Sequence, residues 1–464
     1  MIGEHVEHPH FGRGQIVAIF RNGEEFMVRF ENGLRFRRPR HEFIQDGHPL
    51  AAPPSAPANT YQPQPPMPPT RLAARKLIES LRVGIAPAQH VSELTINLAA
   101  ERASIIQALN QAHQQGGAVR AAVGEYGYGK SHLVELTAQE ALARNFLVAT
   151  VSLDLFELPP HRSFYIYREA LRHMRYPDTD ELGLEPLLEK TAQIGQLLPL
   201  LEKLSPAELD PLLIGLQAIA NTASSRQRRA WMNWLMGGRR VKIMNKAMPR
   251  GIKFPSIYKI GHNARQIAYL LTGLSALARL GNYSWLCVLV DEAESYSLLS
   301  TYQRPKATLF FRAMIYAALR DQQNRIHESE FPQHRWRDYP MAYDQGQSLF
   351  FMFTITRSDI RLPLQEWLED DQILYLEPDV SPQEAGQFLA KMQGYHALAY
   401  GYTAGERQGQ VRRAAAEHLA QGIRNGSISI RQVVRLAVEL YDLLYLYPDY
   451  DVATLLDELR AQMR

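Results

Sequence analysis

The stretch VGEYGYGKSH, residues 123–132, places three glycines, a lysine and a serine between two segments of different periodicity. The apolar run AVRAAV before it is typical of a buried strand, and SHLVELTAQEALAR after it has the spacing of a helix. Glycines let successive backbone N–H groups curl around an anion, and the following helix adds the positive end of its dipole. The stretch therefore predicts a phosphate-binding loop between a strand and a helix.

The loop fits the pattern G-x-x-x-x-G-K-[ST] from Gly124 to Ser131. The Lys130 ammonium is expected to reach the β- and γ-phosphates of ATP, and the Ser131 hydroxyl to complete the shell of a Mg²⁺ ion. The residues expected to contact the nucleotide are Gly124, Glu125, Tyr126, Gly127, Tyr128, Gly129, Lys130, Ser131 and His132. The alternative is a glycine-rich turn that binds no ligand.

A second motif, WLCVLVDEAES at residues 285–295, ends an apolar strand in two acidic residues. Asp291 at the strand tip is expected to hold the Mg²⁺ through water, and Glu292 to polarise the water that attacks the γ-phosphate. The alternative is a strand capped by two solvated acids. A carboxylate directly after the magnesium aspartate argues against a GTPase-type site, where a glutamine or a remote group positions the water.

Two further residues are expected near the γ-phosphate. In a sheet ordered 5-1-4-3-2, the strand LFFMFTITRS (349–358) ends there, and Thr356, or else Thr354, could orient the water. The alternative is a threonine present only for its β-propensity. Arg431, at the start of a helix in SISIRQVVRLAVELYDLL, could swing onto the γ-phosphate. Otherwise Arg431 and Arg435, one turn apart, form a solvated face.

Hydrophobic patterning predicts an α/β core at residues 71–379 and a helical lid at 380–464. Five apolar runs separated by helices indicate a parallel sheet covered on both faces; they lie at 118–123, 146–153, 285–290, 349–356 and 372–377. Residues 1–48 contain short β-rich runs with Asn-Gly turns and predict a small, strongly bent β-barrel. Residues 49–70 are a proline-rich linker.

The composition is that of a globular protein: 464 residues, 46% apolar and 21% charged, with a net charge of +3. Cys287 is the single cysteine, so no disulfide forms within the chain and a reducing compartment is expected. The N-terminus shows no signal pattern, and no apolar run approaches the ~18 residues of a membrane span. These features favour a cytoplasmic protein without membrane contact.

Residues 224–253 contain nine Arg or Lys and no acidic residue, within a helical insertion at about 180–280. Trp231 and Trp234 lie among these cations, and phosphate neutralisation and base stacking use such residues. The candidates for nucleic-acid contact are Arg239, Arg240 and Lys242. The alternatives are a solvated insertion, or a surface that meets an acidic face of a neighbouring subunit.

The first 48 residues contain an arginine cluster and three histidines, which are weaker signals of nucleic-acid or metal binding. Arg35, Arg37, Arg38 and Arg40 form a basic cluster, but seven acidic residues balance the seven arginines of this segment. The spacing of His5, His8 and His10 could suit metal ligands. No fourth ligand or cysteine accompanies them, so the pattern favours histidines on the protein surface.

The motifs together resemble the AAA+ class of Walker-type ATPases over residues 71–464. The phrases ARKLIESLRVGIAPAQHVSEL (74–94), GEYGYGKSHLVE, LPPHRSFYIYREALRHMRYP and VLVDEAES look like the ATP-binding proteins of bacteriophage-exclusion (BREX) defence systems, the BrxD-like family. The resemblance implies an AAA+ (ASCE) core, ATP and Mg²⁺, and a role beside a helicase, a methyltransferase and other defence proteins. AAA+ sites usually lie between subunits, which implies a homo-oligomer, a ring or filament, with an arginine from the neighbour: Arg320, or alternatively Arg357.

The segment GEHVEHPHFGRGQIVAIFRNGEEFMVRFENGLRFRR resembles the Tudor- or SH3-like barrels of UvrD-type helicases and CarD-type transcription factors. That resemblance implies docking onto a protein, often the transcription machinery, or onto nucleic acid. The leading hypothesis is an ATP-hydrolysing AAA+ protein that couples lid closure to assembly or remodelling on DNA in phage defence. The alternatives are a scaffold that uses ATP only to hold an assembled state, and a transcription-linked remodeller recruited by the barrel.

Overall fold

The computed structural model divides the chain into two compact units, Met1–Pro68 and Pro69–Arg464, which are described separately. The residues described are 1–20, 23–50, 68–85, 87–190, 211–238, 244, 257, 264–322, 325–333, 340–343, 349–357, 362–377, 379–447, 451 and 453–454. No helix within these ranges is long and apolar enough to cross a membrane.

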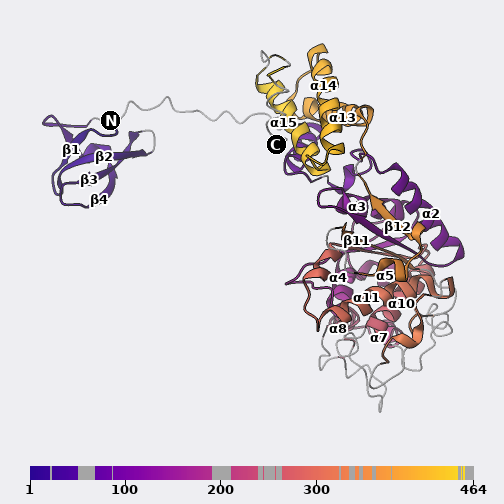
Figure 1. The fold of residues 1–464 in the computed structure, drawn as a ribbon. Helices are drawn as coiled ribbons and strands as arrows, with labels where there is room; N and C mark the ends of the chain where they lie inside the picture. The colour runs from indigo at the N-terminus through magenta and orange to yellow at the C-terminus, as the bar shows by residue number, and fades with distance from the viewer. Residues whose placement is uncertain are drawn as a thin grey trace. The chain divides into compact units, whose positions relative to one another are not determined.

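The first unit is one antiparallel sheet with the order β4-β3-β2-β1-β5-β6 (Figure 1). Its strands are β1 (His5–His8), β2 (Gly12–Phe20), β3 (Glu25–Phe30), β4 (Arg35–Pro39), β5 (Ile44–Gln45) and β6 (His48–Pro49). Alternation along the strands buries one face, whose core is Val6, Ile16, Phe26, Val28, Phe30 and Phe43. A register shift between Ile16 and Ala18 interrupts the pairing of the long strand β2 with β3.

The second unit is built on a six-stranded sheet with the order β12-β7-β11-β10-β8-β9. Its strands are β7 (Ala118–Gly124), β8 (Leu147–Ser152), β9 (Met174–Arg175), β10 (Leu286–Asp291), β11 (Leu349–Thr356) and β12 (Ile373–Leu376). The pairings among β12, β7, β11, β10 and β8 are all parallel. These five strands have the predicted order 5-1-4-3-2, and the short antiparallel β9 extends the β8 edge.

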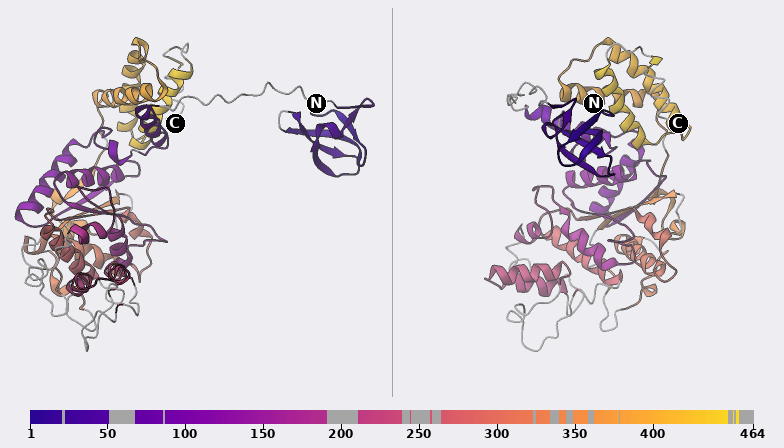
Figure 2. Two further views of the ribbon diagram at one scale, coloured as in Figure 1. Left: turned by 180° about the vertical axis from the view of Figure 1, so that it is seen from behind. Right: turned by 90° about the vertical axis from the view of Figure 1, so that its left-hand side faces the viewer.

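Helices cover both faces of this sheet, as the three views show (Figure 1, Figure 2). The first face packs on α2 (Ala99–Gln115) and α3 (Lys130–Ala143). The second face packs on α4 (Ser163–Arg172), α10 (Ala264–Leu280) and α11 (Arg304–Leu319). Apolar side chains alternate between the two cores, so the strands read as continuous apolar runs.

Further helices widen the second face: α5 (Glu185–Lys190), α7 (Pro211–Ala220) and α8 (Ser225–Leu235). The expected insertion at about 180–280 includes residues that belong to the core, because every residue of α10 from Ala264 to Ala278 is buried. Trp231 and Trp234 of α8 are also fully buried, with their rings 5.6 Å apart. The expectation that they are available to stack on bases is therefore wrong: the apolar face of α8 packs against α7 and the core.

The C-terminal helices α13 (Pro382–Tyr400), α14 (Glu406–Arg424) and α15 (Ile430–Leu446) form a separate apolar cluster. Helix α1 (Pro69–Arg82), from the other end of the unit, packs into the same cluster through Ala74, Leu77, Ile78 and Leu81. Short elements complete the fold: α12 (Leu364–Trp367), η2 (Arg40–Glu42), η3 (Ala88–His90), η5 (Ala293–Leu298), η6 (Arg320–Gln322), η7 (Glu328–Glu330) and η9 (Asp370–Gln372).

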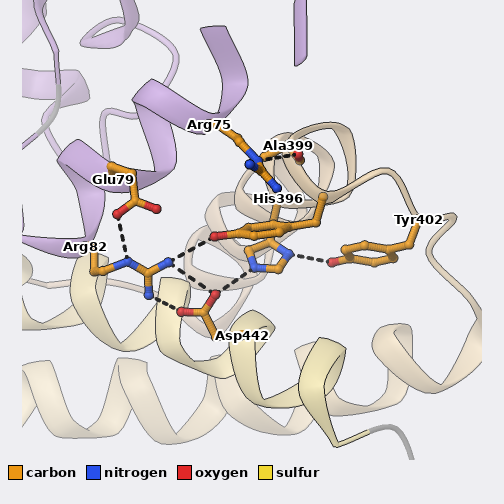
Figure 3. Close-up of polar contacts among 8 residues, drawn as sticks. Arg75, Glu79, Arg82, His396, Ala399, Tyr402 and Asp442 are labelled. Carbon is orange, nitrogen blue, oxygen red and sulfur yellow. Dashed lines mark hydrogen bonds and ion pairs between the residues drawn. The ribbon is translucent and has the colours of Figure 1, made fainter. Parts of the chain in front are cut away.

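A polar network joins α1 to the C-terminal helices (Figure 3). Arg82 donates hydrogen bonds to both carboxylate oxygens of Asp442. The same carboxylate bonds to His396 Nε2 at 3.1 Å, and His396 Nδ1 lies 2.9 Å from the Tyr402 hydroxyl. Because Arg82 is the last residue of α1, the network fixes the end of this helix against α13 and α15.

Candidate active site

The glycine-rich loop leaves the carboxyl end of β7 and enters α3 at Lys130. Gly127 and Gly129 have φ angles of 82° and 88°, in the left-handed region that favours glycine. A Cβ on Gly127 would lie 2.6 Å from Ser429 Cβ, so the segment before α15 packs directly on the loop. The loop is therefore closed on one side by the C-terminal helices.

The Lys130 ammonium is buried at the mouth of the loop, with 6% of the residue exposed. Its Nζ donates to the Gly124 carbonyl at 3.2 Å and to the Glu125 carbonyl at 3.3 Å. A third bond, of 2.9 Å, goes to Thr356 Oγ1. The structure thus places the threonine at the tip of β11 directly beside the lysine of the loop.

Asp291 ends β10, the strand beside β11, and is 8% exposed. Its Oδ1 accepts hydrogen bonds from the Thr354 hydroxyl and from the Glu292 N–H, the latter at 3.0 Å. The Glu292 N–H also lies 3.2 Å from Thr354 Oγ1. Thr354 therefore holds the aspartate in place, a role that sequence reasoning did not assign to it.

The Glu292 carboxylate has a partner that sequence reasoning missed. Ser152, the last residue of β8, donates its hydroxyl to Glu292 Oε2 at 3.0 Å. The register explains the contact, because Ser152 lies opposite Asp291 where both parallel strands end. A polar residue at the carboxyl end of the strand beside the acidic motif was the available signal.

Arg431 lies in the first turn of α15, where it meets the loop. Its Nη1 donates to the Tyr126 hydroxyl at 2.8 Å, and its backbone N–H donates to the Gly127 carbonyl at 3.4 Å. The guanidinium also lies 5.7 Å from the centre of the Tyr126 ring. The structure therefore brings this arginine to the glycine-rich loop from the opposite end of the unit.

A cavity of about 490 Å³ joins these groups. Its polar lining consists of residues 126–132, which include Tyr128 and Ser131, together with Asp291, Glu292 and Arg431. An apolar wall completes it, formed by Leu81, Val91, Leu94, Ile96, Ile430 and Val434. Sequence reasoning missed this wall, because its members come from the end of α1, the segment after it and α15, and share no local motif.

His132 is neutral in this site. Burial lowers the pKa of its imidazole to about 4, and its Nε2 lies 2.9 Å from Thr95 Oγ1. Thr95 in turn donates its hydroxyl to the Val91 carbonyl. His132 therefore supports the cavity wall and adds no positive charge beside Lys130 at neutral pH.

The remaining candidates lie elsewhere. Arg320 follows α11, whose end approaches Gly117 at the start of β7. Arg320 therefore lies near the amino end of β7, whereas the glycine-rich loop follows its carboxyl end. Arg357 follows Thr356 at the loop edge and pairs with Glu377 at 3.3 Å. Assignment of either residue to a neighbour's site stays a prediction. Arg239, Arg240 and Lys242 lie outside the described residues.

The N-terminal histidines form no metal centre in the structure. Among the residues described, no group of three or more His, Cys, Asp or Glu side chains could hold a metal ion. His8 is buried, with its Nε2 3.3 Å from Glu42 Oε2 and its ring 4.7 Å from that of Phe11. It is a residue of the sheet's core, whereas His5 and His10 are exposed.

Residues 70–194 match a family model described as BREX system ATP-binding protein BrxC/D. A solved structure, the Walker-type ATPase of Pyrococcus abyssi, is 13% identical in sequence, with 79% of this chain and 71% of that chain covered and a TM-score of 0.33. No curated protein matches the sequence.

Proposed function

We propose that this chain binds ATP with Mg²⁺ and hydrolyses it, as a member of the AAA+ class. One observation supports this most directly. Lys130, Asp291 and Glu292 line one cavity, and Thr356 holds the Lys130 ammonium from the strand between the two motifs. The apolar wall of that cavity suits the adenine base, and the glycine loop suits the phosphates.

The donor set fits a magnesium ion. Ser131 supplies a hydroxyl and Asp291 a carboxylate, the oxygen ligands that Mg²⁺ takes alongside water and phosphate. Asp291 Oδ2 makes no hydrogen bond within the described part of the chain, whereas Oδ1 is held by Thr354 and the Glu292 N–H. When bound, the ion would offset the charge on the phosphate oxygens.

In this proposal each protein group has a separate task. The Lys130 ammonium moves from the carbonyls of its own loop to the phosphates. The Thr356 hydroxyl then orients the attacking water. Glu292 accepts the proton of that water. Arg431 senses the γ-phosphate from α15, and its contact with Tyr126 gives the helical lid a direct connection to the loop.

Replacement of Glu292 by Gln tests hydrolysis. ATP turnover should fall by about a thousandfold or more, and ATP affinity should stay within a few-fold of wild type. Lys130→Ala is the companion variant and should lose ATP binding itself. If Glu292→Gln abolishes turnover but preserves defence in cells, the chain is a nucleotide-dependent scaffold. Unchanged turnover in this variant would contradict the assignment of Glu292.

The family match supports a role in phage defence. In that setting the chain would act with other defence proteins, such as a helicase or a methyltransferase, and as a homo-oligomer whose neighbour supplies an arginine. Size measurement with ATP on the Glu292→Gln variant tests oligomerisation, and Arg320→Ala and Arg357→Ala test the arginine. The variant that removes the arginine finger should lose turnover and keep ATP binding.

A contact with DNA is supported by α8. Arg226, Arg228 and Arg229 are exposed within the first five residues of α8, near the end where the helix dipole disfavours cations, and no described residue forms an ion pair with them. Phosphates would offset that cost. Duplex DNA should stimulate ATP turnover in a strongly salt-dependent way. Stimulation that survives replacement of all three arginines by Gln would remove α8 from the DNA interface.

A further inference from the structure

The N-terminal sheet carries a row of exposed polar side chains across four adjacent strands. Residues paired by register in this row are Arg35 with Arg29, Arg29 with Gln15, and Gln15 with His5. All four are exposed, and they lie on the face opposite the apolar core. Strands are about 4.8 Å apart, so the row extends about 14 Å.

One end of the row is a pair of like charges. Arg29 and Arg35 lie directly opposite each other, an arrangement that destabilises a sheet. No ion pair joins either guanidinium to another residue in the described part of the chain, and Gln15 donates to the Gly3 carbonyl. The row therefore holds two exposed cations whose repulsion a bound anion would relieve.

Three acidic side chains of the unit lie beside other cations. Glu25 pairs with Arg37 at 2.5 Å, and Glu42 lies 4.0 Å from Arg38. Glu7 lies opposite Arg13 in the neighbouring row. The overall balance of charge in residues 1–48 thus conceals a local excess of positive charge at Arg29 and Arg35.

We propose that this row binds the phosphate backbone of duplex nucleic acid. Guanidinium groups bind phosphate through paired N–H donors, and a row of about 14 Å is long enough to meet about four phosphates of one strand. A protein interface has an apolar centre, whereas the row contains no apolar side chain. Single strands are held by stacking on aromatic side chains, and the row has none.

The proposal is independent of the ATP site, because every residue of the row belongs to the first unit. It gives the chain a DNA contact separate from α8. The proline-rich segment 49–70 connects the two units, so binding of the sheet would raise the effective concentration of DNA near the ATPase unit.

The test is duplex binding by the full-length protein over a series of salt concentrations. Arg29→Gln/Arg35→Gln is compared with Arg13→Gln/Arg37→Gln, which removes the same charge from two arginines that already face a carboxylate. All variants are made in a background with Arg226, Arg228 and Arg229 replaced by Gln, without nucleotide. The probe is a mixed-sequence DNA duplex.

We expect Arg29→Gln/Arg35→Gln to weaken duplex binding at least tenfold and to make the slope of log K against log salt shallower by about 1.8, since each phosphate contact contributes about 0.9. The control variant should keep the wild-type slope. The melting temperature of the first unit should not fall, because the substitutions remove a repulsion. Equal effects of the two variants, tighter binding to single strands, or no duplex binding by the parent protein would each overturn the proposal.

Discussion

Glu292 has a backbone conformation that side-chain-bearing residues rarely adopt. Its φ of 59° and ψ of 37° lie in the left-handed region, which costs of order 1–3 kcal/mol for a residue other than glycine. Two hydrogen bonds from its N–H, to Asp291 and Thr354, compensate for part of this cost. The strain places the carboxylate of Glu292 within reach of Ser152 at the end of β8.

Ser152→Ala should raise basal ATP turnover several-fold with little change in KM. The serine hydroxyl donates to Glu292 Oε2 and so competes with the attacking water for this carboxylate, while Ser152 itself does not line the ATP cavity. Steady-state kinetics should be measured for Ser152→Ala, for the wild type and for Ser152→Thr. Ser152→Thr retains the hydroxyl and is the control. A fall in kcat would mean that Ser152 aligns Glu292 productively.

His132 should make the stability of the ATPase unit depend on pH. Its folded-state pKa of about 4 lies below the ordinary 6.5, so the unfolded chain binds a proton that the folded chain does not. Stability from this group is complete above pH 6.5 and falls by about 1.4 kcal/mol per unit as the pH drops toward 4.

The measurement is the free energy of unfolding from pH 7 to pH 5 for the wild type and His132→Gln. Glutamine can retain the hydrogen bond to Thr95 but has no proton to gain. The wild type should therefore lose more stability than the variant across this range. Parallel curves would show that the folded chain takes up a proton at His132 as readily as the unfolded chain does, which would contradict the lowered pKa.

Sequence motifs predicted which side chains lie at the candidate site, but they did not predict the hydrogen bonds that position these side chains. Lys130, Asp291 and Glu292 follow from motifs with fixed spacing, and the cavity collects all three. The contacts of Ser152 and Thr354 depend on strand register across the sheet, which no local pattern specifies.

The phosphate-binding loop and the start of α15 form one packed element. Gly127→Ala should lower ATP affinity at least tenfold, because the added methyl combines backbone strain with a 2.6 Å approach to Ser429 Cβ. Gly426→Ala is the matched control, since its φ is also positive, no atom lies within 4 Å of the new Cβ, and the residue does not line the cavity. Isothermal titration with ATP should show the smaller loss for Gly426→Ala.

The contact of α1 with the C-terminal helices depends on Asp442 (Figure 3). Burial raises the pKa of Asp442, but hydrogen bonds from His396 and Arg82 outweigh it and leave the pKa below its usual value. The carboxylate is therefore ionised at neutral pH, and its stabilising contribution is lost only when the pH falls through that lowered pKa.

Asp442→Asn should destabilise the ATPase unit by about 1–2 kcal/mol, since Arg82 and His396 lose a shared charged acceptor in a partly exposed network. The KM for ATP should rise as well, because Gly84 and Ile85, just after α1, line the cavity. Glu79→Gln removes an exposed carboxylate 3.3 Å from the same arginine and should change stability by less than about 0.5 kcal/mol. Equal losses in the two variants would contradict this account.

Strands were the most predictable elements. All five parallel strands lie within about two residues of their predicted ranges, because buried strands are short apolar runs with sharp ends. The position of α1 was not predictable, since its apolar stripe fits any helical surface and its partners lie more than 300 residues away. The same limit applies to α8, whose buried tryptophans looked suited to stack on bases.

The two compact units separate the proposed ATP cavity from the row of exposed polar residues. Every residue of the ATP cavity lies beyond Pro68, and the row through Arg29 and Arg35 lies before it. Composition predicted this division, because a proline-rich segment separates a β-patterned region from an α/β-patterned one. Net charge did not predict the basic row, since the charges of the first unit cancel in the sum.

A chain that begins at Pro69 should hydrolyse ATP with the kcat and KM of the full-length protein. Its apolar clusters contain no residue from the first unit, so the truncation opens no core. Duplex DNA should stimulate the truncated chain only through α8, at higher DNA concentrations than the full-length protein needs, because the tethered contact is gone. A transcription-linked remodeller would also lose its activity in cells on this truncation. Loss of basal ATP turnover would show that the N-terminal sheet belongs to the ATPase machinery, and the separation of tasks would be wrong.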